Sequence, residues 1–148
     1  MRRYVAAFAV LGLALAAIPM PSVHCPAWNV TVIDQFGSPV PGVTVRLSYT
    51  NYSAEGEQHE MDRTTGETGQ VSFPLQTLYA STLRRAYFTV LSARAGVHAS
   101  FGPSASVFAF GKGMEGQDVD LKADIVVIWH GRPSRMTSRI VMKQVRSQ

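Results

Sequence analysis

The chain has 148 residues, which is enough for one domain with a single hydrophobic core. Apolar residues make up 46% and charged residues 16% of the sequence, and these proportions exclude a disordered polyelectrolyte. The formal net charge is +4, but Arg2 and Arg3 lie at the extreme N-terminus and the rest of the chain is nearly neutral, so binding to nucleic acid is not expected.

The N-terminal segment has the pattern of a secretory leader. Arg2 and Arg3 precede an uncharged apolar run over residues 4–20, and prolines follow, as in a signal peptide. The run is shorter than the roughly 20 residues that a membrane-spanning helix needs, so cleavage is favoured over a permanent anchor.

Small residues at the spacing of a cleavage site occur twice, at Ala14 and Ala16 and again at Cys25 and Ala27. We expect cleavage at the second pair, so that the leader ends before Trp28.

This boundary divides the chain into two parts. Residues 1–27 are expected to be a signal peptide or an N-terminal anchor, and residues 28–148 a single domain that is secreted or held in the periplasm or cell envelope. Cys25 is the only cysteine, so an internal disulfide is excluded and the domain must be stable through packing alone.

Alternating apolar and polar residues predict strands in the first half of the domain. The alternation is clearest over residues 43–49 and is also present over 28–34, and the glycines and prolines between these segments predict a loop. The polar, acidic segment 51–63 is expected to be a long excursion between strands, with an edge strand near 59–64. A turn and a short strand over 71–73 follow.

The segment 81–94 departs from this alternation. Leu83, Tyr87, Val90 and Leu91 recur at intervals of three and four, with Ser81 as an N-cap, which predicts a helix. A strand is the alternative, because residues 87–91 also form one apolar run.

Five further strands are predicted, over 97–101, 104–110, 118–121, 125–129 and 137–145. Short strands with this spacing favour a mainly β, antiparallel sandwich with one inserted helix.

The four histidines do not predict a metal site. His24 is expected to leave with the leader, and the zinc-protease pattern that starts at His59 fails because Arg63 stands where the second histidine is required. His98 and His130 lie on separate elements, and no two histidines share a strand face or a helical turn at ligand spacing. We therefore expect no metal and no cofactor.

Two segments resemble the carboxypeptidase regulatory-like, transthyretin-like family of β-sandwich domains. They are residues 32–47 (VIDQFGSPVPGVTVRL) and 64–73 (TTGETGQVSF). The resemblance implies a transthyretin-like or immunoglobulin-like sandwich in which Gly37 and Pro39 shape one loop and Gly69 turns the chain back to pair.

An enzymatic branch of that fold, the hydroxyisourate hydrolases, is similar across the first segment. Thr31 stands in place of that branch's histidine, and Gln70 in place of its arginine. The terminal Tyr-Arg-Gly-Ser is missing, because residues 143–148 read KQVRSQ. We therefore expect no enzyme. A hydrolase of this branch, or another enzyme that uses His98, His130 and an acidic residue, is the alternative.

These observations predict a non-catalytic binding or structural module of the cell envelope. Aromatic and histidine side chains near strand ends, Tyr52, Trp129 and His130, are the candidate contacts to a protein or a carbohydrate. The alternative is that Trp129 and Tyr49 belong to the core. Contact with a membrane is expected only through an uncleaved leader.

Overall fold

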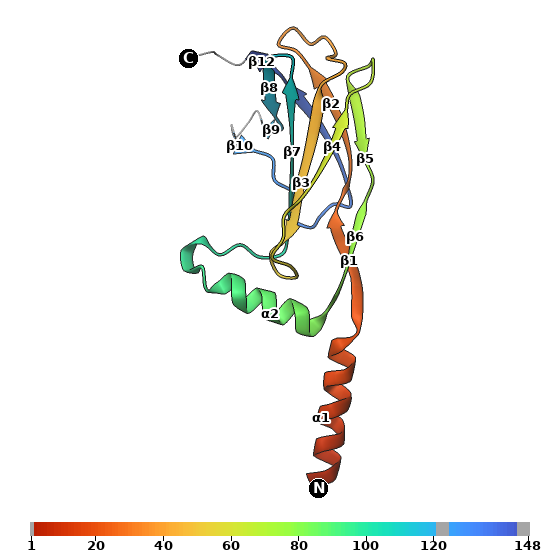
Figure 1. Ribbon diagram of the computed structural model, residues 1–148, viewed down its shortest axis with the longest axis vertical. Coiled ribbons are helices and arrows are strands. Elements are labelled where there is room, and N and C mark those ends of the chain that lie inside the picture. Colours follow the sequence, from red (N-terminus) through yellow and green to blue (C-terminus); the bar gives the residue numbers. More distant parts are fainter. Residues whose placement is uncertain (1, 121–124, 145–148) are drawn as a thin grey trace.

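The computed structural model describes residues 2–120 and 125–144, and the chain is mainly β, as the sequence predicts (Figure 1). The elements in chain order are α1 (Arg2–Ala17), β1 (Pro19–Cys25), β2 (Ala27–Ile33), β3 (Thr44–Asn51), β4 (His59–Thr64), β5 (Gln70–Phe73), β6 (Gln76–Ser81), α2 (Thr82–Ala93), the 3-10 turn η1 (Gly96–His98), β7 (Pro103–Gly111), β8 (Met114–Gln117), β9 (Val119–Asp120), β10 (Ile125–Val126), β11 (Arg135–Val141) and β12 (Lys143–Gln144).

Two sheets form the sandwich. One has five strands in the order β12-β8-β7-β3-β4, and the other has three in the order β11-β2-β5. Neighbouring strands are antiparallel, as predicted, except that β11 runs parallel to β2. Strands β1 and β6 form a two-stranded ribbon, and β9 pairs with β10.

The predicted alternation fills the space between the sheets. Trp28, Val30 and Val32 of β2 are buried, and Val45 and Leu47 of β3 meet them in the same apolar cluster. Side chains on one face of a strand point the same way, so period-two sequences from both sheets close a single core.

A polar chain of contacts lies inside this core. The Trp28 indole N–H donates to Ser138 Oγ at 2.7 Å, and the Ser138 hydroxyl donates to the Asp118 carboxylate. Burial raises the pKa of the Asp118 carboxyl, against the opposing effect of the Ser138 hydrogen bond. The buried indole is thereby satisfied, as a buried donor requires.

The turn between β4 and β5 depends on Gly69, as the sequence predicts. Its φ is +69°, and a Cβ there would lie 2.5 Å from the carbonyl oxygen of Val32. The Val32 N–H in turn donates to the Gly69 carbonyl at 2.8 Å. Only glycine combines this backbone conformation with so close an approach.

The helix predicted over 81–94 is confirmed as α2, with Ser81 Oγ accepting from the Arg84 N–H at 3.2 Å as its N-cap. It lies across one end of the sandwich (Figure 1).

The strand predicted over 97–101 is wrong. Gly96 has a φ of +57° and opens η1, and Val97 is 97% exposed, so the alternation there faces solvent instead of a sheet.

The C-terminal predictions hold in part. The strands expected over 118–121 and 125–129 shorten to β9 and β10, and Trp129 forms an isolated bridge with Ala105. The strand expected over 137–145 divides into β11 and β12, while residues 121 and 145 lie outside the described part. Strand β8 was not predicted, because its sequence MEGQ has no apolar alternation.

The N-terminal segment contains a strand that the sequence analysis missed. β1 pairs antiparallel with β6 from Pro19 opposite Ser81 to Cys25 opposite Gln76, with a bulge near its end. Cys25 is fully buried in the core. Helix α1 projects away from the sandwich (Figure 1), and no helix in the described ranges has the length and apolar character to span a membrane.

Candidate functional site

Three side chains with metal-ligating atoms meet near α2. His24 of β1, Glu55 of the loop between β3 and β4, and His59 of β4 each offer one ligand atom, and these atoms lie within 4.8 Å of one another. The Glu55 carboxylate pairs with the Nε2 of His24 through one oxygen and with the Nε2 of His59 at 3.1 Å through the other. Among residues 2–120 and 125–144 this is the one such group of three.

The loop at residues 52–58 curls back to bring Glu55 into the cluster. Asn51 begins the turn, because its carbonyl accepts from the N–H groups of Ala54 and Glu55 and its side-chain oxygen accepts from the Ser53 N–H. The Asn51 N–H then donates to Glu55 Oε1 at 2.9 Å. An asparagine in this role favours a tight turn over continuation of the strand.

The ring of Tyr49 packs against both imidazoles of the cluster. Tyr49 of β3 lies opposite His59 of β4 in the strand register, and their rings stack with centroids 5.3 Å apart. The His24 ring meets Tyr49 edge-on at 4.9 Å and His59 edge-on at 5.2 Å. Both imidazoles are therefore held in fixed orientations beside the carboxylate.

Burial and hydrogen bonding act against each other on Glu55. The residue is 7% exposed, and burial alone would raise the pKa of its carboxyl. The hydrogen bonds with His59, His24 and the Asn51 N–H outweigh this effect and hold the pKa below its ordinary value. Glu55 is thus a buried carboxylate kept in its charged form.

Helix α2 holds the Glu55 loop against the sandwich. The Arg84 Nε donates to the Ala54 carbonyl at 2.7 Å, and the Ser92 hydroxyl donates to the Tyr52 carbonyl at 2.7 Å. Gly102, after the helix, donates to Ser53 Oγ and accepts from the Tyr52 N–H. The inserted helix therefore acts on the cluster through the loop.

A hollow lies beside Glu55. It lies between the loop and α2, and its lining includes Tyr52, Glu55, Glu57, Phe88 and Leu91. The hollow thus brings two acidic residues, Glu55 and Glu57, into one lining, which favours the approach of a cation.

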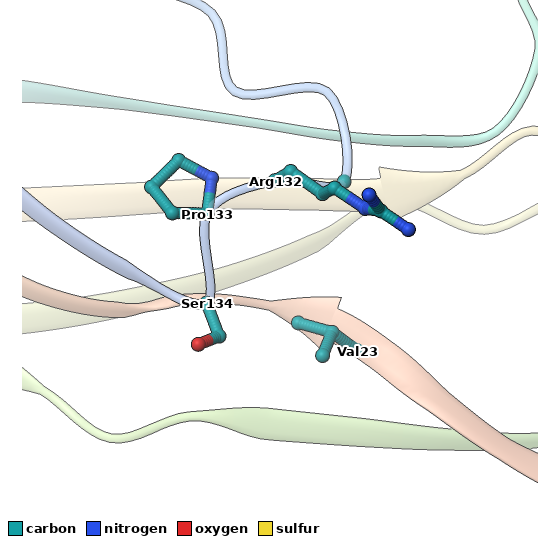
Figure 2. A pocket seen from close by; sticks show the side chains of 5 residues that line it. Val23, Arg132, Pro133 and Ser134 are labelled. Atoms are coloured by element: carbon teal, nitrogen blue, oxygen red, sulfur yellow. The ribbon is translucent and has the colours of Figure 1, made fainter.

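A second hollow lies beside β1, and Figure 2 shows Val23 and Ser134 among the side chains that line it. Arg132 and Pro133 complete this part of its lining. This hollow is wide and open, and Arg132 is the one charged residue among the described residues that line it. A ligand site usually has several polar groups that converge on one point, and the described part of this lining does not provide them.

The residues proposed from the sequence as contacts do not join the cluster. Trp129 is 2% exposed and its indole N–H donates to the Pro133 carbonyl, so it belongs to the core, as the alternative interpretation had it. His130 is exposed next to it. Tyr52 is 39% exposed and lines the hollow beside Glu55. Tyr49 packs against the core and against both imidazoles.

The cluster could not be found from the spacing of histidines within single strands or helical turns. His24 and His59 share neither, and their rings nonetheless lie 5.2 Å apart. They reach each other across β1 and β4, which no spacing along the chain reveals. The available signal was weak: Glu55 and His59 are four residues apart, and Glu55 follows a short run suited to a turn.

The arrangement has the donor set of a transition-metal centre. Two imidazoles and one carboxylate are the ligands of several catalytic zinc sites and of one class of iron(II) sites. The three groups come from separate segments and converge at one point, which is what a coordination sphere requires.

Comparison with known proteins adds a distant similarity of fold. No protein-family model matches the chain, and no curated protein matches it. Among solved structures, 3-chlorocatechol 1,2-dioxygenase from Rhodococcus opacus 1CP is similar, with a TM-score of 0.48 and 14% sequence identity. The alignment covers 86% of this chain and 64% of the dioxygenase chain, so this chain spans less than two thirds of that protein.

Proposed function

We propose that the protein is an exported β-sandwich module of the cell envelope that binds a divalent transition-metal ion, with zinc as the first candidate. The observation that carries the proposal is the convergence of His24, Glu55 and His59, whose ligand atoms lie within 4.8 Å of one another. The leader pattern at the N-terminus supports the exported location.

The environment of the three side chains favours a bound cation. The Glu55 carboxyl, whose pKa is lowered, carries a negative charge at neutral pH. Tyr49 packs against both imidazole rings and orients them. Preoriented ligands reduce the ordering that binding would otherwise require. The hollow beside Glu55 places a second carboxylate, that of Glu57, near the three side chains.

Titration with Zn²⁺ tests the proposal. The purified protein should bind one Zn²⁺ per chain in isothermal titration calorimetry, and Co²⁺ at the same site should give visible absorption bands of a protein-bound ion. Affinity should fall as pH is lowered, because protons compete with the metal for imidazole and carboxylate.

Single substitutions identify the ligands. His24→Ala, Glu55→Gln and His59→Gln should each weaken Zn²⁺ binding by about 100-fold or more. His59 is the least buried of the three, so His59→Gln is the variant expected to disturb folding least. The matched controls are His98→Ala and His130→Ala, which remove exposed histidines elsewhere and should leave the affinity unchanged.

Two results would overturn the proposal. One is the absence of Zn²⁺ and Co²⁺ binding by folded wild-type protein. The other is binding that His59→Gln leaves intact and His98→Ala or His130→Ala abolishes.

A further inference from the structure

We infer that the leader is removed by cleavage between Ala16 and Ala17, so that β1 remains part of the mature domain. The inference rests on the exported location in the proposed function but not on metal binding. It replaces the later boundary, before Trp28, that the sequence alone favours.

Helix α1 contributes nothing to the core. Its described side chains from Arg3 to Ala17 are exposed apart from the half-buried Ala16, and large apolar groups such as Tyr4 and Phe8 are each 73% exposed. The helix extends away from the sandwich (Figure 1). The domain can therefore lose it without opening a cavity.

The end of α1 carries the pattern that cleavage requires. Ala14 and Ala16 place small residues three and one positions before the Ala16–Ala17 bond. The helix ends at Ala17, and Pro19 follows at the first position of β1, so the chain leaves helical geometry next to this bond.

From Pro19 onward the chain belongs to the domain. β1 pairs along β6, and the Arg85 guanidinium of α2 donates to Ser22 Oγ at 2.7 Å. His24 is 6% exposed and Cys25 is 0% exposed. Burial on this scale marks residues of a core, in contrast to the exposed helix before them.

Cleavage before Trp28 would remove all of these contacts. β6 would lose its partner strand, and the core would lose Cys25. Glu55 would lose His24 and keep a buried carboxylate with one imidazole beside it. The unpaired edge of β6 and the buried Glu55 charge with fewer partners would both be unfavourable. Cleavage before Trp28 would therefore cut into the folded domain.

The reaction is hydrolysis of one peptide bond by a leader peptidase of the export pathway. Water adds its hydroxyl to the Ala16 carbonyl carbon and a proton to the Ala17 nitrogen as the C–N bond breaks. The products are the carboxylate of the leader and the new N-terminal amine of the domain. No other reactant is needed.

N-terminal sequencing and intact-mass measurement of the exported protein test the inference. The full chain, with a C-terminal affinity tag, is expressed in a Gram-negative host and purified from the periplasm. The expected N-terminus is Ala17. An N-terminus at Trp28, any other N-terminus or an uncut chain would overturn the inference.

A pair of matched variants sharpens the test. A branched residue at the position before the cut blocks processing, because that position accepts small side chains. Ala16→Val should therefore accumulate as the uncut chain, and Ala27→Val should be processed as the wild type is. The opposite result, with Ala27→Val uncut and Ala16→Val processed, would contradict the inference.

The two proposals fail in distinguishable ways. Protein that begins at Ala17 and binds no Zn²⁺ contradicts the proposed function alone. Protein that begins at Trp28 and still binds Zn²⁺ contradicts the processing site, and it also removes His24 from the ligand set.

Discussion

Two buried carboxylates in different regions of the molecule differ in the partners that surround them. Glu55, beside α2, and Asp118, beside the core strands, are each 7% exposed. Two imidazoles and a backbone N–H lower the pKa of Glu55, whereas burial, with one serine hydroxyl to oppose it, raises the pKa of Asp118. The partners of a buried acid therefore decide the direction in which its pKa moves.

Removing a partner from Glu55 should produce the largest change. His24→Ala leaves the Glu55 carboxylate buried without one of its hydrogen-bond partners, so the free energy of unfolding at pH 7 should fall by about 2–3 kcal/mol. Urea denaturation followed by tryptophan fluorescence measures this. His98→Ala is the control and should change the value by less than about 0.5 kcal/mol. Equal stability of the two variants would show that the cluster does not stabilise the fold.

The second largest effect should be the contribution of Glu55 to the pH dependence of the free energy of unfolding. A lowered native pKa means that its stabilisation is present above the ordinary carboxyl pKa and is lost as pH falls through the native value. The stability difference between the wild type and Glu55→Gln should therefore shrink as the pH falls below the ordinary carboxyl pKa of about 4.3. Denaturation midpoints measured as the pH is lowered from neutrality test this. A difference that stays constant, or grows on acidification, would contradict the ion pairing.

Asp118 should behave in the opposite way. Asp118→Asn removes a charge that burial disfavours and keeps an acceptor for Ser138, so at pH 7 the variant should equal the wild type or exceed it by up to about 1 kcal/mol. Because the native pKa is raised, the wild type should gain stability relative to the variant as pH falls through that value. Calorimetric melting at pH 3 and pH 7, as approximate endpoints, measures both effects. A loss above about 1 kcal/mol at pH 7 would contradict this account.

The smallest effect should come from loosening the Glu55 loop. Ser92→Ala removes the hydrogen bond from α2 to the Tyr52 carbonyl and should cost about 0.5–1 kcal/mol, with a few-fold weaker affinity for Zn²⁺. Thr89→Ala, at an exposed position of the same helix, is the matched control. Equal Zn²⁺ affinities in the two variants would mean that the Ser92 hydrogen bond does not position the loop.

Much of the fold could be predicted because its determinants are local. The alternation around Leu47 and Val30 marks strands with one buried face, and Ser81 marks the start of α2. β1 escaped notice because its sequence, PMPSVHC, contains two prolines and directly follows a leader-like run. Its strand character depends on pairing with β6, which is a tertiary property.

The candidate site could not be predicted for a related reason. His24 and Glu55 are 31 positions apart, and their contact requires both the β1–β6 ribbon and the turn at Asn51. The residues proposed instead were chosen for aromatic character near strand ends. That criterion also selects core residues, as Trp129 shows.

Burial makes the Cys25 thiol unreactive in the folded chain. Burial raises its pKa to about 12, so the nucleophilic thiolate is almost absent at neutral pH, and the sulfur is shielded from solvent. In an oxidising compartment the native chain should therefore resist mixed-disulfide formation and sulfenic-acid damage. The sulfur would become reactive only when β1 detaches from β6. The rate at which Cys25 is alkylated therefore measures how often the β1–β6 ribbon opens.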